Sequence, residues 1–211
     1  MKSSVMSQIP HEPSENQNLD TEADISMVPS QIDSSAEPWE RTFQYLFDRF
    51  VDAYEDRGRE VDQLFSQEDK AFLAAIGASP QEIFDFVEDW AEDGEPTPEV
   101  IQEVTGIRRD YFLTVQHGKF PFQKMSSGEL PSPWASLGGY RWLPRIIAKA
   151  RAKLHGELPP DIMYGCGRDR QFLRGVNIGL AEFLKLVWEA AQNKEKILAY
   201  VNHKARRHDP A

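Results

Sequence analysis

Hydrophobic residues recur at helical spacing along the chain from residue 38 onward. One series falls at i, i+3, i+4, i+7, i+8 and i+11, which places its members on one face of an α-helix. This series consists of Phe43, Leu46, Phe47, Phe50, Val51 and Tyr54, and charged residues lie between its members. The pattern therefore predicts an amphipathic helix that packs one face against a core.

Helix boundaries are marked by capping residues. Ser66 suits the N-cap of a short helix that ends at Gly77. At Ser79-Pro80-Gln81-Glu82, an N-cap serine, a proline at the first helical position and a capping-box glutamate occur together. A helix is expected to run from here to about residue 91, and Thr97-Pro98 is expected to begin the next one.

The remaining segments differ in how clearly they predict a structure. Residues 107–116 predict either a helix or a strand, because periodicity over so short a run does not decide between them. Tyr140 to His155 predicts a helix that carries Pro144 in its first turn and ends at Gly156. Helical patterns resume near Asp169 and continue at about 180–192 and 194–205.

One helical unit recurs after a shift of 100 residues. Between 69–91 and 169–191, six of 23 positions are identical, and the order of helices and turns is shared. The identical pairs are Asp69/Asp169, Phe72/Phe172, Leu73/Leu173, Glu82/Glu182, Val87/Val187 and Ala91/Ala191. We interpret the recurrence as a tandem duplication. The alternative is that two unrelated amphipathic helix pairs share their apolar spacing.

These patterns predict a mainly α fold with two helical units. Residues 1–37 lack hydrophobic periodicity and are rich in Ser, Glu, Asp, Gln, Asn and Pro, so we expect a disordered acidic tail. The first helical unit is expected at 38–116. A linker rich in Gly, Pro and Ser follows at 117–136, then the second unit at 137–205 and a short tail at 206–211.

Charge is distributed unevenly between the two units. The formal net charge is −10, but residues 1–135 hold 10 Lys and Arg against 27 Asp and Glu, whereas residues 136–211 hold 14 against 7. Two interpretations are open. The halves attract each other within one molecule, or the basic half faces an acidic protein or an anionic small ligand.

The second unit carries a series of short motifs. They are Pro131-Ser132-Pro133, Leu137-Gly138-Gly139-Tyr140, Leu143-Pro144-Arg145, Lys149-Ala150-Arg151-Ala152, Leu154-His155-Gly156, Tyr164, Cys166, Asp169 and Phe172-Leu173. Over about 131–202 they resemble an uncharacterised bacterial family, domain of unknown function 5069. After Cys166, Gly167-Arg168 stand where that family usually has Pro-Leu. The resemblance implies a bacterial, cytoplasmic protein and no particular activity.

By the same resemblance, residues 38–105 would be a degenerate copy of the family domain. This first copy lacks the Leu-Gly-Gly-Tyr and Leu-Pro-Arg elements. A single cysteine excludes an intrachain disulfide, which agrees with a reducing compartment. No apolar stretch is long enough to span a bilayer, so we expect no membrane partner.

The strongest candidate binding site is a basic helix at 141–153. Arg141, Arg145 and Lys149 are spaced i, i+4 and i+8, so they are expected to form one edge of this helix. Arginine can bind carboxylates and phosphates through two hydrogen bonds. Gly138-Gly139 could let an anion approach backbone donors at the helix start. The candidate binding residues are Gly138, Gly139, Tyr140, Arg141, Arg145, Lys149, Arg151, Tyr164, Cys166 and Asp169.

The leading hypothesis is thus a non-enzymatic helical module that binds an acidic partner or an anionic ligand. The alternative is a small enzyme whose site combines Tyr140, Arg145, Tyr164, Cys166 and Asp169, which requires these side chains to converge. The histidines lack metal-ligand spacing, so neither a metal nor a cofactor is expected. Overall acidity and the lack of a recognised module argue against nucleic-acid binding.

Overall fold

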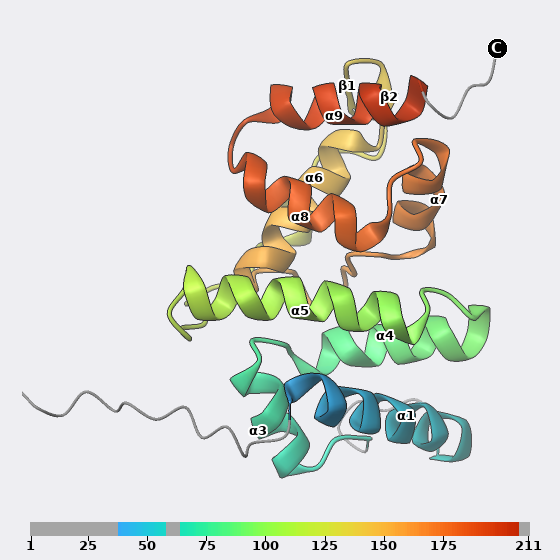
Figure 1. Ribbon diagram of the computed structural model, residues 1–211, viewed down its shortest axis with the longest axis vertical. Helices are drawn as coiled ribbons and strands as arrows, with labels where there is room; N and C mark the ends of the chain where they lie inside the picture. Colours follow the sequence, from blue (N-terminus) through green and yellow to red (C-terminus); the bar gives the residue numbers. More distant parts are fainter. Residues whose placement is uncertain (1–37, 58–63, 207–211) are drawn as a thin grey trace, which may run out of the picture. The chain divides into compact units, whose positions relative to one another are not determined.

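The computed structural model describes residues 38–57 and 64–206, and most of these residues are helical. The predicted mainly α fold is therefore confirmed (Figure 1). The tail expected at 1–37 lies outside the described residues, as does nearly all of the tail expected at 206–211.

Helices flank a long connection that contains a small hairpin. The first part of the chain contributes α1 (Trp39–Arg57), α3 (Gln67–Ala75), α4 (Pro80–Asp93) and α5 (Pro98–Thr114). The connection contains the 3-10 turn η1 (Ser127–Glu129) and the strands β1 (Ser136–Leu137) and β2 (Tyr140–Arg141). The last part contributes α6 (Leu143–His155), α7 (Gly167–Gly175), α8 (Leu180–Ala190) and α9 (Lys194–Arg206).

The capping signals before α4 act as predicted. Ser79 Oγ accepts a hydrogen bond from the Glu82 amide at 3.3 Å, and the Glu82 carboxylate accepts one from the Ser79 amide at 3.0 Å. The helix ends at Gly94, whose φ of 70° is readily adopted by glycine. The run at 107–116, for which helix and strand were both open, belongs mostly to α5.

The helix expected from residue 140 begins three residues later. Tyr140 and Arg141 pair with Leu137 and Ser136 in an antiparallel hairpin, and Trp142 then adopts a left-handed conformation with φ 73°. A residue in this conformation cannot continue a right-handed helix, so α6 starts at Leu143. The expected start of the basic helix was therefore wrong, and Arg141 precedes it.

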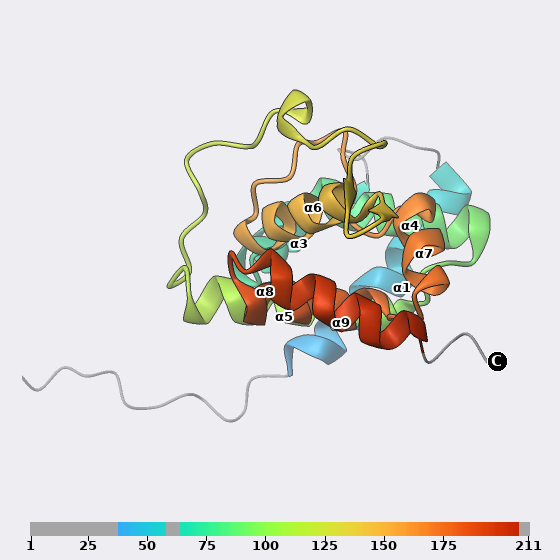
Figure 2. The ribbon, with the colours of Figure 1, turned by 90° about the horizontal axis from the view of Figure 1, so that it is seen from above.

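Helix α5 links the two predicted units. It packs against α1 from the first unit and against α6 and α8 from the second, while α1 also packs against α4 (Figures 1 and 2). Apolar side chains from both units form one buried core, which includes Phe47, Ile101 and Phe183. The two sets of helices are thus stabilised by a common hydrophobic interior.

Residues at and after the end of α5 contact the C-terminal end of α6. The Gln116 side chain donates through Nε2 to the His155 carbonyl at 3.0 Å, and the Lys124 ammonium donates to the Gly156 carbonyl at 2.7 Å. The fully buried Arg108 guanidinium lies against Gly156. Positive charge stabilises the negative end of a helix dipole, so these contacts fasten α6 to the first part of the chain.

Several local contacts recur after the shift of 100 residues. Arg49 of α1 pairs with Asp69, and Lys149 of α6 pairs with Asp169. In each unit the following turn contains a residue with positive φ. That residue is Gly77 at 72° in one unit and Asn177 at 54° in the other. The tandem duplication itself stays a prediction.

Gly77 provides a test of the turn between α3 and α4. A Cβ there would lie 2.7 Å from the Phe112 Cβ, and φ is 72°. Gly77→Ala should lower the free energy of unfolding by about 2–4 kcal/mol, because left-handed strain and a core clash add. Gly94→Ala is the control, since φ is 70° but nothing lies within 4 Å, so strain alone should cost about 1–2 kcal/mol. Urea denaturation of both variants measures the difference, and equal losses would contradict the packing argument.

Candidate functional site

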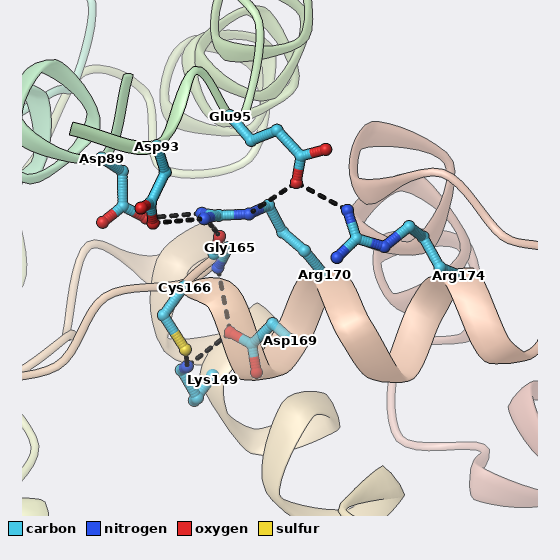
Figure 3. Close-up of polar contacts among 9 residues, drawn as sticks. All are labelled: Asp89, Asp93, Glu95, Lys149, Gly165, Cys166, Asp169, Arg170 and Arg174. Atoms are coloured by element: carbon cyan, nitrogen blue, oxygen red, sulfur yellow. Dashed lines mark hydrogen bonds and ion pairs between the residues drawn. The ribbon is translucent and has the colours of Figure 1, made fainter. Parts of the chain in front are cut away.

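A buried carboxylate organises the second part of the chain. Asp169 is fully buried and accepts hydrogen bonds from the Trp142 indole at 2.8 Å and from the Gly165 amide at 2.9 Å. It also forms an ion pair with Lys149, which is only 3% exposed (Figure 3 draws the Lys149 and Gly165 contacts). Both carboxylate oxygens are therefore satisfied, as a buried charge requires. This group joins α6, the 164–166 turn and α7.

Cys166 occupies the N-cap position of α7, where Ser66 stands before α3. Ser66 accepts a hydrogen bond from the Asp69 amide, whereas Cys166 makes no side-chain cap. Its sulfur instead lies 3.3 Å from the Lys149 ammonium nitrogen (Figure 3). Lys149 thus contacts both Cys166 and Asp169.

The other side chains of the alternative enzyme site make separate contacts. Tyr164 is 1% exposed and donates to the Leu180 carbonyl at 2.9 Å; burial and then the Asp169 charge raise its pKa well above the usual value. Arg145 donates to the Pro131 carbonyl at 2.8 Å. Tyr140 is half-buried in β2. Of the five candidates, Cys166 and Asp169 therefore share a contact with Lys149, and Tyr164 interacts with the charge of Asp169.

Arg170 joins α7 to the acidic end of α4. Its guanidinium lies 2.5 Å from Asp89, 3.6 Å from Asp93 and 3.6 Å from Glu95 (Figure 3). Arg174 adds a pair with Glu95 at 2.6 Å. These contacts place carboxylates of the first part around cations of the second part.

Lys153 makes a second such connection, in a buried environment. Its ammonium lies 3.2 Å from the Glu82 carboxylate, and Lys153 is 1% exposed. Burial opposes ionisation of Glu82, but the charge of Lys153 and the Ser79 amide outweigh it, so the Glu82 pKa is lowered. The predicted attraction between the acidic and basic halves is thus present in these contacts.

The predicted basic edge of the helix does not form. Arg141 lies before α6, Arg145 binds a backbone carbonyl, and Lys149 is buried against Asp169. The physical reason is that Lys149 and Ile146 share the inward face of α6, where the core and the Asp169 carboxylate lie. The helix itself therefore does not present the expected row of exposed cations.

Gly138 and Gly139 form the turn of the hairpin between β1 and β2. Both have positive φ, 58° and 89°, as a two-residue hairpin turn requires. A Cβ at Gly138 would also overlap the Leu198 side chain. The turn and this close packing account for the glycine pair, whereas its predicted role in anion binding stays a prediction.

An open cavity lies beside the start of α6, and we call it the arginine–tryptophan pocket. It has a volume of about 280 Å³ and is lined by Pro133, Trp134, Arg141, Trp142, Arg168, Gln171 and Phe172. Trp134 is 74% exposed, and the Arg168 guanidinium lies 5.5 Å from the centre of the Trp142 ring. The pocket therefore combines aromatic surfaces with cations.

The two arginines of this pocket have no carboxylate within ion-pair distance among the residues that the structure describes. Arg141 and Arg168 are both exposed. Their guanidinium groups can therefore bind a carboxylate or phosphate from outside the chain.

Sequence reasoning identified Arg141 in this pocket and missed most of its other members. Trp134 and Trp142 are not among the predicted binding residues, and Arg168 enters the sequence analysis only as part of the departure from the family pattern after Cys166. The tryptophan directly after the Pro131-Ser132-Pro133 motif was a usable signal. The left-handed conformation of Trp142 had no such signal, because left-handed φ is rare outside glycine and asparagine.

The buried pair leads to a stability prediction. Asp169→Asn leaves the Lys149 ammonium buried without a counter-charge, so the free energy of unfolding should fall by about 3–5 kcal/mol. Asp69→Asn is the matched comparison; Arg49 is 44% exposed and can turn to water, so the loss should be about 1–2 kcal/mol.

A double variant that removes both charges tests whether the unpaired charge causes the loss of stability. The double variant Lys149→Met/Asp169→Asn should be more stable than Asp169→Asn alone in the same denaturation experiment. A double variant that is less stable than Asp169→Asn would show that an unpaired charge is not the reason for the loss.

Comparison with known proteins is informative for the second part of the chain. Residues 128–211 match the family described as Domain of unknown function (DUF5069), and this match covers less than half of the chain. No curated protein and no solved structure matches. Among the described residues, none of the helices could span a membrane, and no group of three or more His, Cys, Asp or Glu side chains could hold a metal ion. The C-terminal region at 128–211 is thus similar to this family of unknown function.

Proposed function

We propose that the protein is a non-enzymatic interaction module that binds an acidic peptide segment of a partner protein at the arginine–tryptophan pocket. The observation that carries this proposal is the exposed Trp134 beside two arginines that lack carboxylate partners among the described residues. Tryptophan and arginine are the residue types that most often dominate protein–protein binding energy. Their combination here favours a partner that supplies both an apolar side chain and a negative charge.

The ion pairs within the fold support the same binding site. Lys149, Lys153 and Arg170 pair with carboxylates of this chain. Their charges are therefore neutralised locally and contribute little to attracting a partner. Arg141 and Arg168 keep their charge available at the surface, so they can steer an acidic segment toward the pocket.

The exposure of the pocket favours a peptide over a small molecule. Trp134 is 74% exposed, so one wall of the pocket is mostly open to water. A small ligand would leave much of that indole uncovered, whereas a peptide that continues past the pocket would bury it. Burial of an indole contributes a large part of its stabilisation through removal of apolar surface from water.

We also propose that the protein works in the bacterial cytoplasm. A single cysteine agrees with a reducing compartment, and the family resemblance implies a bacterial, cytoplasmic protein. An acidic protein in that compartment is the partner class that the pocket fits.

A peptide display library tests this function. Library members carry one aromatic residue flanked by Asp and Glu, and selected peptides are compared with versions in which Asn and Gln replace the acids. Wild-type protein should bind the acidic peptides at least about tenfold more tightly, because charge-assisted hydrogen bonds to arginine are lost in the neutral versions. Fluorescence polarisation at two salt concentrations measures the difference, which should shrink at high salt.

Two pocket variants and one control locate the binding. Trp134→Ala and Arg168→Glu should each weaken binding about tenfold or more, while Lys194→Glu changes an equal charge on an exposed position of α9 and should not. Thermal unfolding confirms that all three fold. Failure to select any acidic peptide, or equal binding by wild type and both pocket variants, would contradict the proposal.

A further inference from the structure

A second cavity lies between α5, α6 and α8, and we call it the inter-helix pocket. Its volume is about 270 Å³, and its lining includes Tyr111 of α5, Arg151 and His155 of α6, and Trp188 of α8. These three helices pack against one another (Figure 1). The pocket is therefore built by both parts of the chain, and the residues of the family match supply only some of its walls.

Aromatic side chains form a large part of these walls. The Tyr111 ring lies 5.4 Å from the His155 ring at an interplanar angle of 26°, and 5.4 Å from the Trp188 ring at 72°. The three rings thus hold each other in fixed orientations. A rigid arrangement of this kind offers flat surfaces to a planar ring at little entropic cost.

Arg151 brings an incompletely satisfied cation to this pocket. One of its terminal nitrogens donates to the Ala191 carbonyl at 2.8 Å, but its Nε is buried and has no hydrogen-bond partner. Among the described residues, no carboxylate lies within ion-pair distance of Arg151. Burial lowers the pKa of Arg151, which reflects the free-energy cost of partly removing this charge from water. An anion in the pocket would offset that cost.

Ala191, whose carbonyl accepts the Arg151 hydrogen bond, has an unusual backbone conformation. Ala191 has φ 49° and ψ −113°, a conformation that costs a non-glycine residue free energy. It follows the last residue of α8 and lines the pocket, where its carbonyl receives the Arg151 hydrogen bond. This contact holds the guanidinium at the pocket.

One carboxylate, that of Glu157, lies beside the His155 ring. Glu157 lies 3.4 Å from His155 Nδ1, and Arg151 is not its partner. The positive charge of Arg151 is therefore available to a ligand, and the aromatic rings beside it define the shape of the rest of the site.

We propose that the inter-helix pocket binds a small planar ring that carries an anionic group. The ring packs against Tyr111, His155 and Trp188, and its carboxylate or phosphate accepts hydrogen bonds from Arg151. This site is separate from the arginine–tryptophan pocket and does not depend on the proposed peptide binding. It assigns a small-molecule ligand class to a chain whose other pocket fits a peptide.

Defined probes test the ligand class. Indole-3-carboxylate represents an aromatic carboxylate, and adenosine 5′-monophosphate represents an aromatic phosphate. Indole-3-carboxamide and adenosine are their neutral counterparts, and inorganic phosphate is the anion without a ring. Calorimetric titration should show saturable binding of at least one aromatic anion, at least about tenfold tighter than its neutral counterpart and tighter than phosphate. The probe that binds more tightly shows whether the pocket prefers a carboxylate or a phosphate.

Variants then assign the binding to this pocket. Arg151→Gln should weaken binding of the preferred probe at least about tenfold, while Arg151→Lys should retain part of it. Arg168→Gln is the matched control, because it removes an arginine from the other pocket and should leave probe binding unchanged. It should weaken only the acidic peptide, so the two proposals fail or succeed separately.

A measurement on the unaltered protein covers the case in which Arg151→Gln does not fold. The chain has five tryptophans, so its nitrogen-15 spectrum contains five indole signals, and Trp188→Phe assigns one of them. Titration with the preferred probe should shift the Trp188 signal most. Absence of binding by every aromatic anion at about millimolar concentration, equal binding of neutral counterparts, or a largest shift at another tryptophan would overturn the proposal.

Discussion

The buried carboxylate of Asp169 is the group on which the second part of the molecule depends. It receives the Trp142 indole from the N-cap of α6, the Lys149 ammonium from within α6, and the Gly165 amide from the turn before α7. A buried charge is tolerated only when such partners surround it, so these segments are held together as a set. Because Trp142 is one of them, the same contact also positions a wall of the arginine–tryptophan pocket.

Charge pairing within the chain determines which cations can act on other molecules. Carboxylates of α4 and the residue Glu95 receive Lys153, Arg170 and Arg174, so part of the acidic surface of the first half serves the second half. Three arginines of the second part that have no carboxylate partner among the described residues line two pockets, Arg141 and Arg168 in one and Arg151 in the other. Part of the positive charge of the second half is therefore neutralised by carboxylates of the first half. Fewer cations are left to bind other molecules.

The matching contacts of the two helical units show where the units differ. Ser66 caps α3 through its hydroxyl, whereas Cys166 stands at the same place before α7 and its sulfur contacts Lys149 instead. The surroundings of the two aspartates also differ, since Arg49 is 44% exposed and Lys149 is buried. The second unit thus encloses a polar cluster in apolar core, where electrostatic interactions are stronger than at the surface.

The sequence by itself determined the helical class, the capping of α4 and the glycine stops, because these depend on hydrophobic period and on side chains within a few residues. It also indicated the charge asymmetry and the similarity of the second part to a family of unknown function. Only the tertiary structure decided which partner each cation of the second part contacts. Lys149 and Arg145 share a helix with Arg151, yet one is buried on Asp169, one binds a backbone carbonyl and one lines a pocket. Their partners lie on other helices or on distant loops, and local sequence spacing carries no information about contacts of that range.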